Sequence, residues 1–161
     1  WAMGPATVIA KMRMILTHVG AWAPMAEQKA VAKFFGNREA IKNFSANFKK
    51  ELEIRLRGIY DGFTQLKNEG LSVDAIAPEA ALYLTIKIDL VGKKTAEGKT
   101  LADQAEVTSY LLGNAGLAIV PFYAFGAAKT STWYRLSVGT CKKEEIGEMI
   151  DKLREALLKL S

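Results

Sequence analysis

The chain has 161 residues, which is long enough for one domain with a hydrophobic core. Half of the residues are hydrophobic and 24% are charged, a composition that excludes disordered and fibrous proteins. The 22 basic residues are interspersed with 17 acidic ones, and such dispersed positive charge does not indicate a nucleic-acid-binding protein.

The sequence contains one cysteine and one histidine. A single cysteine cannot form an internal disulfide, and the two side chains are too few for a metal site, so we expect a reducing cytoplasm and no metal. No apolar run approaches the roughly twenty residues of a membrane span, so we expect no membrane segment. Because the chain starts at Trp1, within what reads as structured sequence, we expect a fragment of a longer protein.

Two short helices are predicted at the start of the chain. The first covers residues 6–19 and ends at Gly20, and the second covers 25–35 and ends at Gly36. The first helix has an apolar stripe at helical spacing, formed by Val8, Ile9, Met12, Leu16 and Val19.

One long helix is predicted from Asn37, a favourable N-cap, to Gly70, a favourable C-terminal stop. Its apolar positions recur about every 3.6 residues. At about 1.5 Å per residue the helix would be close to 50 Å long, so we expect it to connect two lobes. The apolar positions are Ile41, Phe44, Phe48, Leu52, Leu56, Ile59, Phe63 and Leu66.

The rest of the chain mixes strands and helices. Alternating apolar residues or short apolar runs predict the strands, and apolar residues at helical spacing predict the helices. The predicted strands are 81–89, 117–120 and 133–139, and the predicted helices are 100–112 and 143–160. We expect all three strands in one sheet, with the last two antiparallel. The predicted fold class is α+β, a small sheet of about three strands covered by helices and preceded by the long helix.

Three possible sites are better explained without a function. The loop from Gly92 to Thr100 lies between a strand and a helix, but five residues separate its glycines where a phosphate-binding P-loop has four, so a basic surface turn is favoured. His18 has no second histidine or cysteine to join it, so we interpret it as a capping or packing residue. Cys141 precedes the last helix, but no histidine lies near it in sequence, so a nucleophile is not favoured.

Arg135 is the strongest candidate site residue. In the strand 133–139, Tyr134, Leu136 and Val138 form the apolar face, while Arg135 and Ser137 point the other way. A planar guanidinium on the polar face of a strand can bind a carboxylate through two parallel hydrogen bonds. From the spacing alone, a surface salt bridge is an equally good interpretation.

Three segments resemble the class I/II aminotransferases of fold type I, which depend on pyridoxal phosphate. Trp133–Gly139 resembles the strand near the C-terminus of that family. Leu117–Pro121, followed by Phe125-Gly126, is similar to the strand and loop that lead into the family's pocket, although Phe122 stands where the family more often has glycine. Trp1–Pro5 is similar to the stretch that closely follows the cofactor lysine. The overall similarity is to the aspartate aminotransferase type.

The resemblance implies that residues 1–161 are the C-terminal small domain, with 1–36 leading in from a large domain and 37–70 connecting the two. It implies that Arg135 holds the substrate α-carboxylate, that Phe125 belongs to the same pocket, and that the intact enzyme is a homodimer. It places the cofactor lysine before Trp1, so no residue here is expected to bind the cofactor. Such a fragment is expected to be inactive alone.

Some details of the resemblance limit what it implies. Lys11, Lys29 and Lys33 lie on predicted helices and would be solvated, so none is expected to replace the cofactor lysine. The turn from Val19 to Pro24, which lies at the dimer interface in the family, holds no arginine that could select a dicarboxylic substrate. A competing interpretation is a non-catalytic α+β module that binds amino acids or a partner protein through the long helix. A nucleotide-binding enzyme is the third.

Overall fold

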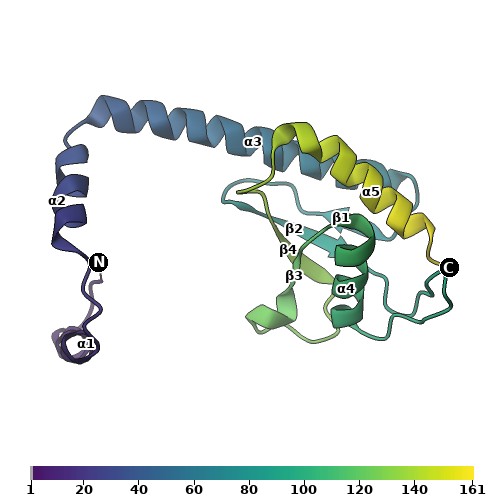
Figure 1. The fold of residues 1–161 in the computed structure, drawn as a ribbon, viewed down its shortest axis with the longest axis horizontal. Coiled ribbons are helices and arrows are strands. Elements are labelled where there is room, and N and C mark those ends of the chain that lie inside the picture. Colours follow the sequence, from purple (N-terminus) through teal and green to yellow (C-terminus); the bar gives the residue numbers. More distant parts are fainter. Residues whose placement is uncertain (1) are drawn as a thin grey trace. The chain divides into compact units, whose positions relative to one another are not determined.

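The computed structural model describes residues 2–161, which form two compact units that meet inside one helix, between Ala46 and Asn47 (Figure 1). The first unit contains α1 (Ala6–Val19), α2 (Met25–Phe34) and the start of α3 (Arg38–Asn68). The second unit contains the rest of α3 and all the elements that follow. These are β1 (Val73–Ala75), β2 (Tyr83–Ile88), α4 (Gln104–Ala115), β3 (Val120–Pro121), the 3₁₀ helix η1 (Phe122–Phe125), β4 (Trp133–Ser137), the 3₁₀ helix η2 (Lys143–Glu145) and α5 (Ile146–Leu158).

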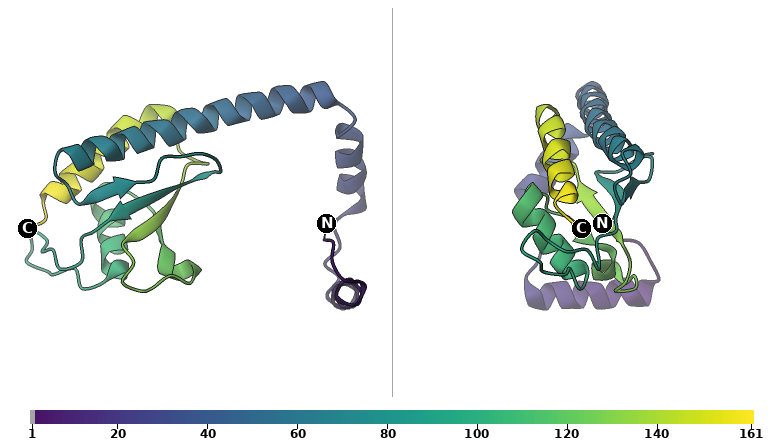
Figure 2. Two further views of the ribbon diagram at one scale, coloured as in Figure 1. Left: turned by 180° about the vertical axis from the view of Figure 1, so that it is seen from behind. Right: turned by 90° about the vertical axis from the view of Figure 1, so that its right-hand side faces the viewer.

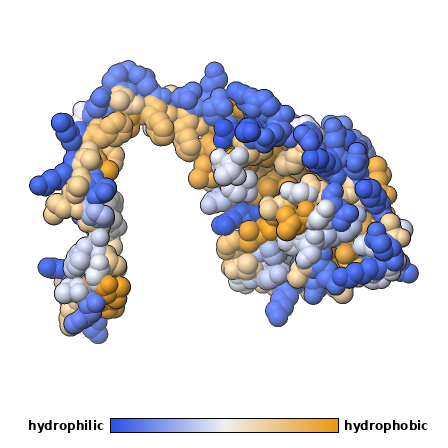
Figure 3. All heavy atoms as spheres, in the orientation of Figure 1, coloured by the Kyte–Doolittle hydropathy of each residue, from blue (hydrophilic) through white to orange (hydrophobic). Residues whose placement is uncertain are grey.

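The helices of the first unit begin and end close to the predicted residues. Helix α1 ends where Gly20 adopts φ 72° and donates its N–H to Leu16 O, a left-handed turn that glycine adopts without strain. None of the residues of α1 and α2 is buried in the part of the chain that the structure describes, and their apolar side chains lie at the surface (Figure 3). The larger exposed ones are Val8, Met12, Met14, Ile15, Val19, Met25, Val31 and Phe34.

Helix α3 confirms the predicted long helix. The Asn37 side chain accepts a hydrogen bond from the Ala40 N–H at 3.1 Å, and Gly70, at φ 86°, donates its N–H to Lys67 O. The apolar stripe is buried only in its second half, where α3 lies in the second unit. Its buried members are Leu52, Leu56, Ile59, Phe63 and Leu66. None of the helices in residues 2–161 is both long and apolar enough to cross a membrane.

The sheet has four strands in the order β1-β2-β4-β3, and every neighbouring pair is antiparallel. The three predicted strands therefore share one sheet, and the last two are antiparallel, as expected. The fourth strand, β1, was missed because a three-residue edge strand is stabilised chiefly by its partner and has little pattern of its own. The predicted strand at 117–120 is Val120–Pro121 instead, and proline suits this position because β3 is an edge strand.

The two faces of the sheet differ in composition. The inner face is buried in one hydrophobic core together with α3, α4 and α5, and its members are Val73, Leu84, Ile86, Ile88, Tyr134 and Leu136. The outer face carries side chains that are half-buried or exposed, namely Tyr83, Thr85, Lys87, Trp133, Arg135 and Ser137. The three helices thus supply the core on one side of the sheet and leave the other side uncovered within this unit (Figure 2).

Helix α4 starts later than predicted. Its N-cap is Asp103, whose carboxylate accepts the N–H groups of Ala105 and Glu106, both at 2.9 Å. The Glu106 carboxylate reaches back to the Ala102 N–H at 2.7 Å, so two carboxylates satisfy amides just before the helix and in its first turn. The predicted start at Thr100 was wrong because Thr100 pairs with Lys94 in an isolated β-bridge.

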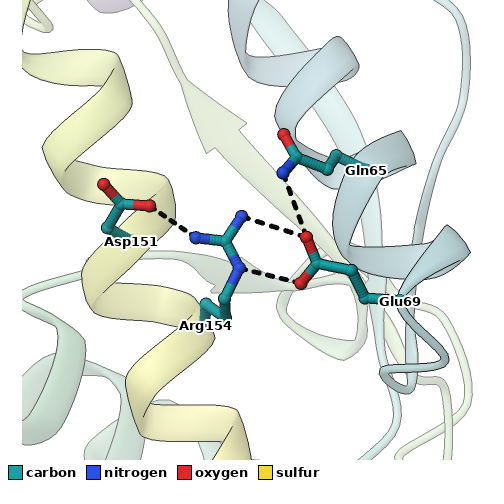
Figure 4. A network of polar contacts seen from close by, with 4 residues as sticks. All are labelled: Gln65, Glu69, Asp151 and Arg154. Carbon is teal, nitrogen blue, oxygen red and sulfur yellow. Dashed lines mark hydrogen bonds and ion pairs between the residues drawn. The ribbon is translucent and has the colours of Figure 1, made fainter.

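Helix α5 packs closely on α3. A Cβ at Gly62 of α3 would lie 2.5 Å from Ile150 Cγ1 of α5, so only glycine allows this approach. On the surface, Arg154 of α5 donates to both carboxylate oxygens of Glu69 at the end of α3, at 2.8 and 3.2 Å, and also to Asp151 (Figure 4). These contacts fix the C-terminal helix against the core.

Candidate functional site

Arg135 lies on the outer face of a central strand. Strand β4 pairs with β2 on one side and β3 on the other, so Arg135 stands opposite Thr85 and Val120. Its side chain is half-buried, while its neighbours along the chain, Tyr134 and Leu136, are buried on the inner face. The predicted alternation is therefore confirmed, and folding of the core orients Arg135 away from the helices.

Two aromatic rings hold the guanidinium group. Arg135 Cζ lies 4.3 Å from the centroid of the Tyr83 ring and 4.3 Å from that of the Phe125 ring. Tyr83 belongs to β2 and Phe125 to η1, directly after β3, so the rings reach Arg135 from the two strands that flank β4. We call Tyr83 and Phe125 the aromatic clamp. Each ring attracts the cation through its negative face.

Helix η1 orients Phe125. The rings of Phe122 and Phe125 meet edge to face, with centroids 6.3 Å apart and an interplanar angle of 86°. Gly126 then turns the chain at φ 92° and donates its N–H to Tyr123 O. Phe122 therefore packs against Phe125, one of the two rings of the aromatic clamp.

The Arg135 guanidinium is not neutralised by the fold. In residues 2–161, no carboxylate oxygen lies within 4.0 Å of an Arg135 nitrogen, the largest separation of an ion pair. Nine other ion pairs form in the same region. The surface salt bridge that the spacing alone allowed is thus not formed there. A guanidinium that is held by rings keeps its N–H donors for an anion, and a planar carboxylate can accept two of them in parallel.

The sequence analysis proposed Arg135 and Phe125 as site residues but not Tyr83. Alternation in 81–89 already placed Tyr83 on the face opposite Leu84 and Ile86. The pairing of β2 with β4, which sets Tyr83 opposite Ser137 and diagonal to Arg135, cannot be read from either strand alone.

The basic loop forms a compact turn. The N–H groups of Gly92, Lys94, Thr95 and Gly98 donate to Leu101 O, Ser161 O, Lys99 O and Thr95 O. Amides used in this way do not converge on a phosphate, which agrees with the interpretation as a surface turn.

Neither His18 nor Cys141 joins the aromatic clamp. His18 is exposed in the last turn of α1. Burial, and secondarily the charge of Glu145, raises the pKa of the Cys141 thiol. The thiol also donates a weak hydrogen bond to Lys142 O. A raised pKa disfavours the thiolate, so Cys141 has the character of a packing residue.

The lysines do not fit the role of a cofactor anchor. Lys11 lies on α1, and Lys29 and Lys33 lie on α2; all three are exposed. A lysine that reacts with a carbonyl cofactor is activated by desolvation or by a neighbouring cation, and exposure provides no desolvation. Exposure thus does not favour these three lysines as the anchor for a carbonyl cofactor.

Comparison with known proteins points to one family. A family model described as aminotransferase class I and II matches residues 1–153. A probable aspartate/prephenate aminotransferase from Rickettsia typhi is 28% identical over 133 residues, which cover 82% of this chain and 30% of that protein. Aspartate aminotransferase from Rhizobium meliloti is 26% identical over 163 aligned positions, which cover 100% of this chain and 37% of that protein. The chain thus spans about a third of the length of these curated relatives.

Solved structures share the fold. An aspartate aminotransferase from Thermus thermophilus (tetra mutant 1) gives a TM-score of 0.74 at 22% identity and covers 96% of this chain and 37% of its own. The aspartate aminotransferase of Rhizobium meliloti gives a TM-score of 0.62 at 26% identity and covers 73% of this chain and 28% of its own. Since the family model matches nearly the whole chain, this protein belongs to the class I and II aminotransferase family.

Proposed function

We propose that this chain is the substrate-carboxylate-binding domain of an aminotransferase. The reaction is transfer of an amino group from an amino acid, with aspartate as the expected donor, to a 2-oxo acid. Arg135 binds the α-carboxylate that amino acids and 2-oxo acids have in common, and Phe125 forms part of the same pocket. The observation that supports this most directly is the aromatic clamp, which holds the guanidinium without neutralising it.

A common carboxylate subsite suits a reaction with two different substrates. The amino acid and the 2-oxo acid differ at Cα and in the side chain, but each has a planar α-carboxylate. One arginine that donates two hydrogen bonds to this group in each half-reaction would fix the orientation of both substrates, and orientation alone is worth several kcal/mol.

The cofactor and the partners follow from family membership. We propose that pyridoxal phosphate is bound by residues other than those of this chain, in a large domain of the same protein, and that the intact enzyme is a homodimer. The exposed apolar side chains of α1 and α2 support such a partner surface, because a set of this size favours burial against another part of the protein. A cytoplasmic location remains a prediction from the single cysteine.

A non-catalytic binding module is the second candidate. The same apolar surface would then dock on a partner protein, and Arg135 would capture a carboxylate without a reaction. The two candidates differ in turnover and not in binding, so a binding measurement alone does not separate them.

The test is an assay of the complete gene product that contains residues 1–161. Protein purified with added pyridoxal phosphate is incubated with aspartate or other amino acids and a 2-oxo acid, and the new amino acid is quantified. We expect transfer by the parent and a large loss in Arg135→Gln. Carboxylate binding without transfer would favour the binding module, and transfer unaffected by Arg135→Gln would contradict the assignment of Arg135.

A further inference from the structure

We infer that Tyr83 is a positioning residue for Arg135: its ring holds the guanidinium in the orientation in which a substrate carboxylate meets two N–H groups at once. This inference rests on the proposed role of Arg135 as the carboxylate-binding residue. It starts from the 4.3 Å approach of Arg135 Cζ to the centroid of the Tyr83 ring.

The Arg135 side chain needs such a support. An arginine side chain has many rotamers, and a bidentate contact requires most of this freedom to be lost before or during binding. Its neighbours across the strands are Thr85 and Val120, and a valine side chain has no polar group for a guanidinium. In the described region the aromatic clamp is the support that the geometry gives to the guanidinium.

Tyr83 is the more firmly anchored of the two rings. Its backbone belongs to the ladder that joins β2 to β4, and the residue after it, Leu84, is buried in the core at 1% exposure. The ladder therefore fixes Tyr83 and Arg135 in one frame. Both rings are exposed, Tyr83 at 42% and Phe125 at 54%, but Phe125 belongs to a single 3₁₀ turn, so its position depends on the loop that follows β3.

The ring itself, not the hydroxyl, makes the contact. The measured approach is to the face of the ring, and phenylalanine has the same face with a similar quadrupole. A side chain that is apolar but has no ring fills the same space without attracting the cation. Tyr83→Phe and Tyr83→Leu therefore separate positioning by the ring from simple filling of space.

The experiment uses the complete gene product that contains residues 1–161, labelled with ¹⁵N at arginine, and acetate as the probe. The Nε–Hε resonance of Arg135 is assigned by its loss in Arg135→Lys, and acetate is titrated against chloride at constant ionic strength. The readouts are the ring-current shift of the Arg135 side-chain protons and the apparent Kd for acetate. The matched control is Val120→Ala, which removes an apolar group opposite Arg135 but no ring.

In Tyr83→Leu we expect a smaller ring-current shift and an apparent Kd that rises about three- to fivefold, as loss of one cation–π contact implies. Tyr83→Phe and Val120→Ala should both stay close to the parent. Tyr83→Val is a second ring-free variant with high strand preference, should Tyr83→Leu not fold.

Two contrary results are distinguishable. If Tyr83→Leu or Tyr83→Val binds acetate as the parent does, or if Tyr83→Phe is as weak as Tyr83→Leu, positioning by the ring is overturned while the role of Arg135 stands. If acetate shifts the parent spectrum no more than that of Arg135→Lys, the carboxylate-binding role itself fails, and the role of Tyr83 fails with it.

Discussion

Tyr134 and Arg135 are adjacent in β4 but serve opposite faces of the sheet. The Tyr134 ring is fully buried in the core, and its hydroxyl donates a hydrogen bond to the buried Gln104 side chain. Arg135 lies on the outer face between the two rings of the aromatic clamp. The alternation of side chains along one strand therefore places a core residue and the proposed carboxylate-binding residue on opposite faces. Substitutions on the two faces should have different consequences.

On the outer face, we expect Arg135→Lys in the full-length enzyme to lower kcat/KM for amino acids and 2-oxo acids by about ten- to a hundredfold. Lysine keeps the charge but loses the two parallel donors, so it attracts the carboxylate without fixing its orientation. The absorbance of the bound cofactor and the thermal midpoint should stay unchanged. Lys87→Arg, an exchange in the opposite sense on the same face, is the control. Full activity in Arg135→Lys would refute the role.

The sequence predicted this division of faces but not all the residues of the site. Alternation within 133–139 was sufficient to place Arg135, because the period of a strand is set by its backbone. Placing Tyr83 beside Arg135 required the register between β2 and β4, which depends on how the two strands fit over the core. Leu117 and Ile119, which were predicted to lie in a strand, are buried but lie outside the ladder, because a buried apolar run does not reveal where strand pairing starts.

On the inner face, we expect Tyr134→Phe to lower the free energy of unfolding by about 1–3 kcal/mol, because it leaves the buried Gln104 carbonyl without its donor. Burial raises the pKa of the Tyr134 hydroxyl, so the donor stays protonated at neutral pH and this cost should not depend on pH there. Denaturant titration measures the change. The double variant Tyr134→Phe/Gln104→Leu should recover most of the loss; a double variant as unstable as the sum of the single ones would contradict this account.

The isolated chain should form no stoichiometric covalent adduct with pyridoxal phosphate and should transfer no amino group. The reason is that the lysines considered as anchors, Lys11, Lys29 and Lys33, are all exposed. Borohydride reduction at low cofactor concentration, followed by peptide mapping, checks this expectation. Sparse labelling spread over many lysines is the expected pattern. Complete labelling of one lysine would show that the chain contains its own anchor.

Packing between α3 and α5 predicts that Gly62→Ala destabilises the second unit. A Cβ there would lie 2.5 Å from Ile150 Cγ1. Such overpacking costs about 1–3 kcal/mol, against a gain of about 1 kcal/mol in helix preference. Gly58→Ala is the matched control, because its Cβ would lie 3.3 Å from the end of the Ile146 side chain. Denaturant midpoints should fall more for position 62 than for 58. In Ile150→Ala, which removes the obstructing atoms, Gly62→Ala should no longer destabilise.

The contact between Glu69 and Arg154 predicts a pH-dependent contribution to stability (Figure 4). The hydrogen bond from Arg154 is the largest cause of a lowered Glu69 pKa. A carboxyl group whose pKa is lower in the folded state stabilises the fold above its unfolded pKa of about 4.3 and loses this effect as the pH falls through the folded value. Thermal midpoints of the parent and of Glu69→Gln should therefore differ at pH 7 and converge below about pH 4.

Because the Arg154 and Glu69 side chains remain 24% and 37% exposed, solvent and salt screen the pair, so the difference at pH 7 should be small and should shrink with added salt. Glu148→Gln is the control, since Glu148 pairs with Lys152 within α5 and connects no second element. The thermal midpoint of Glu148→Gln should stay closer to that of the parent than the midpoint of Glu69→Gln does. The reason is that the Glu69 pair joins two segments far apart in the chain. If the difference in thermal midpoint between the parent and Glu69→Gln stayed constant from pH 7 to pH 3, the ion pair would not be the source of that difference.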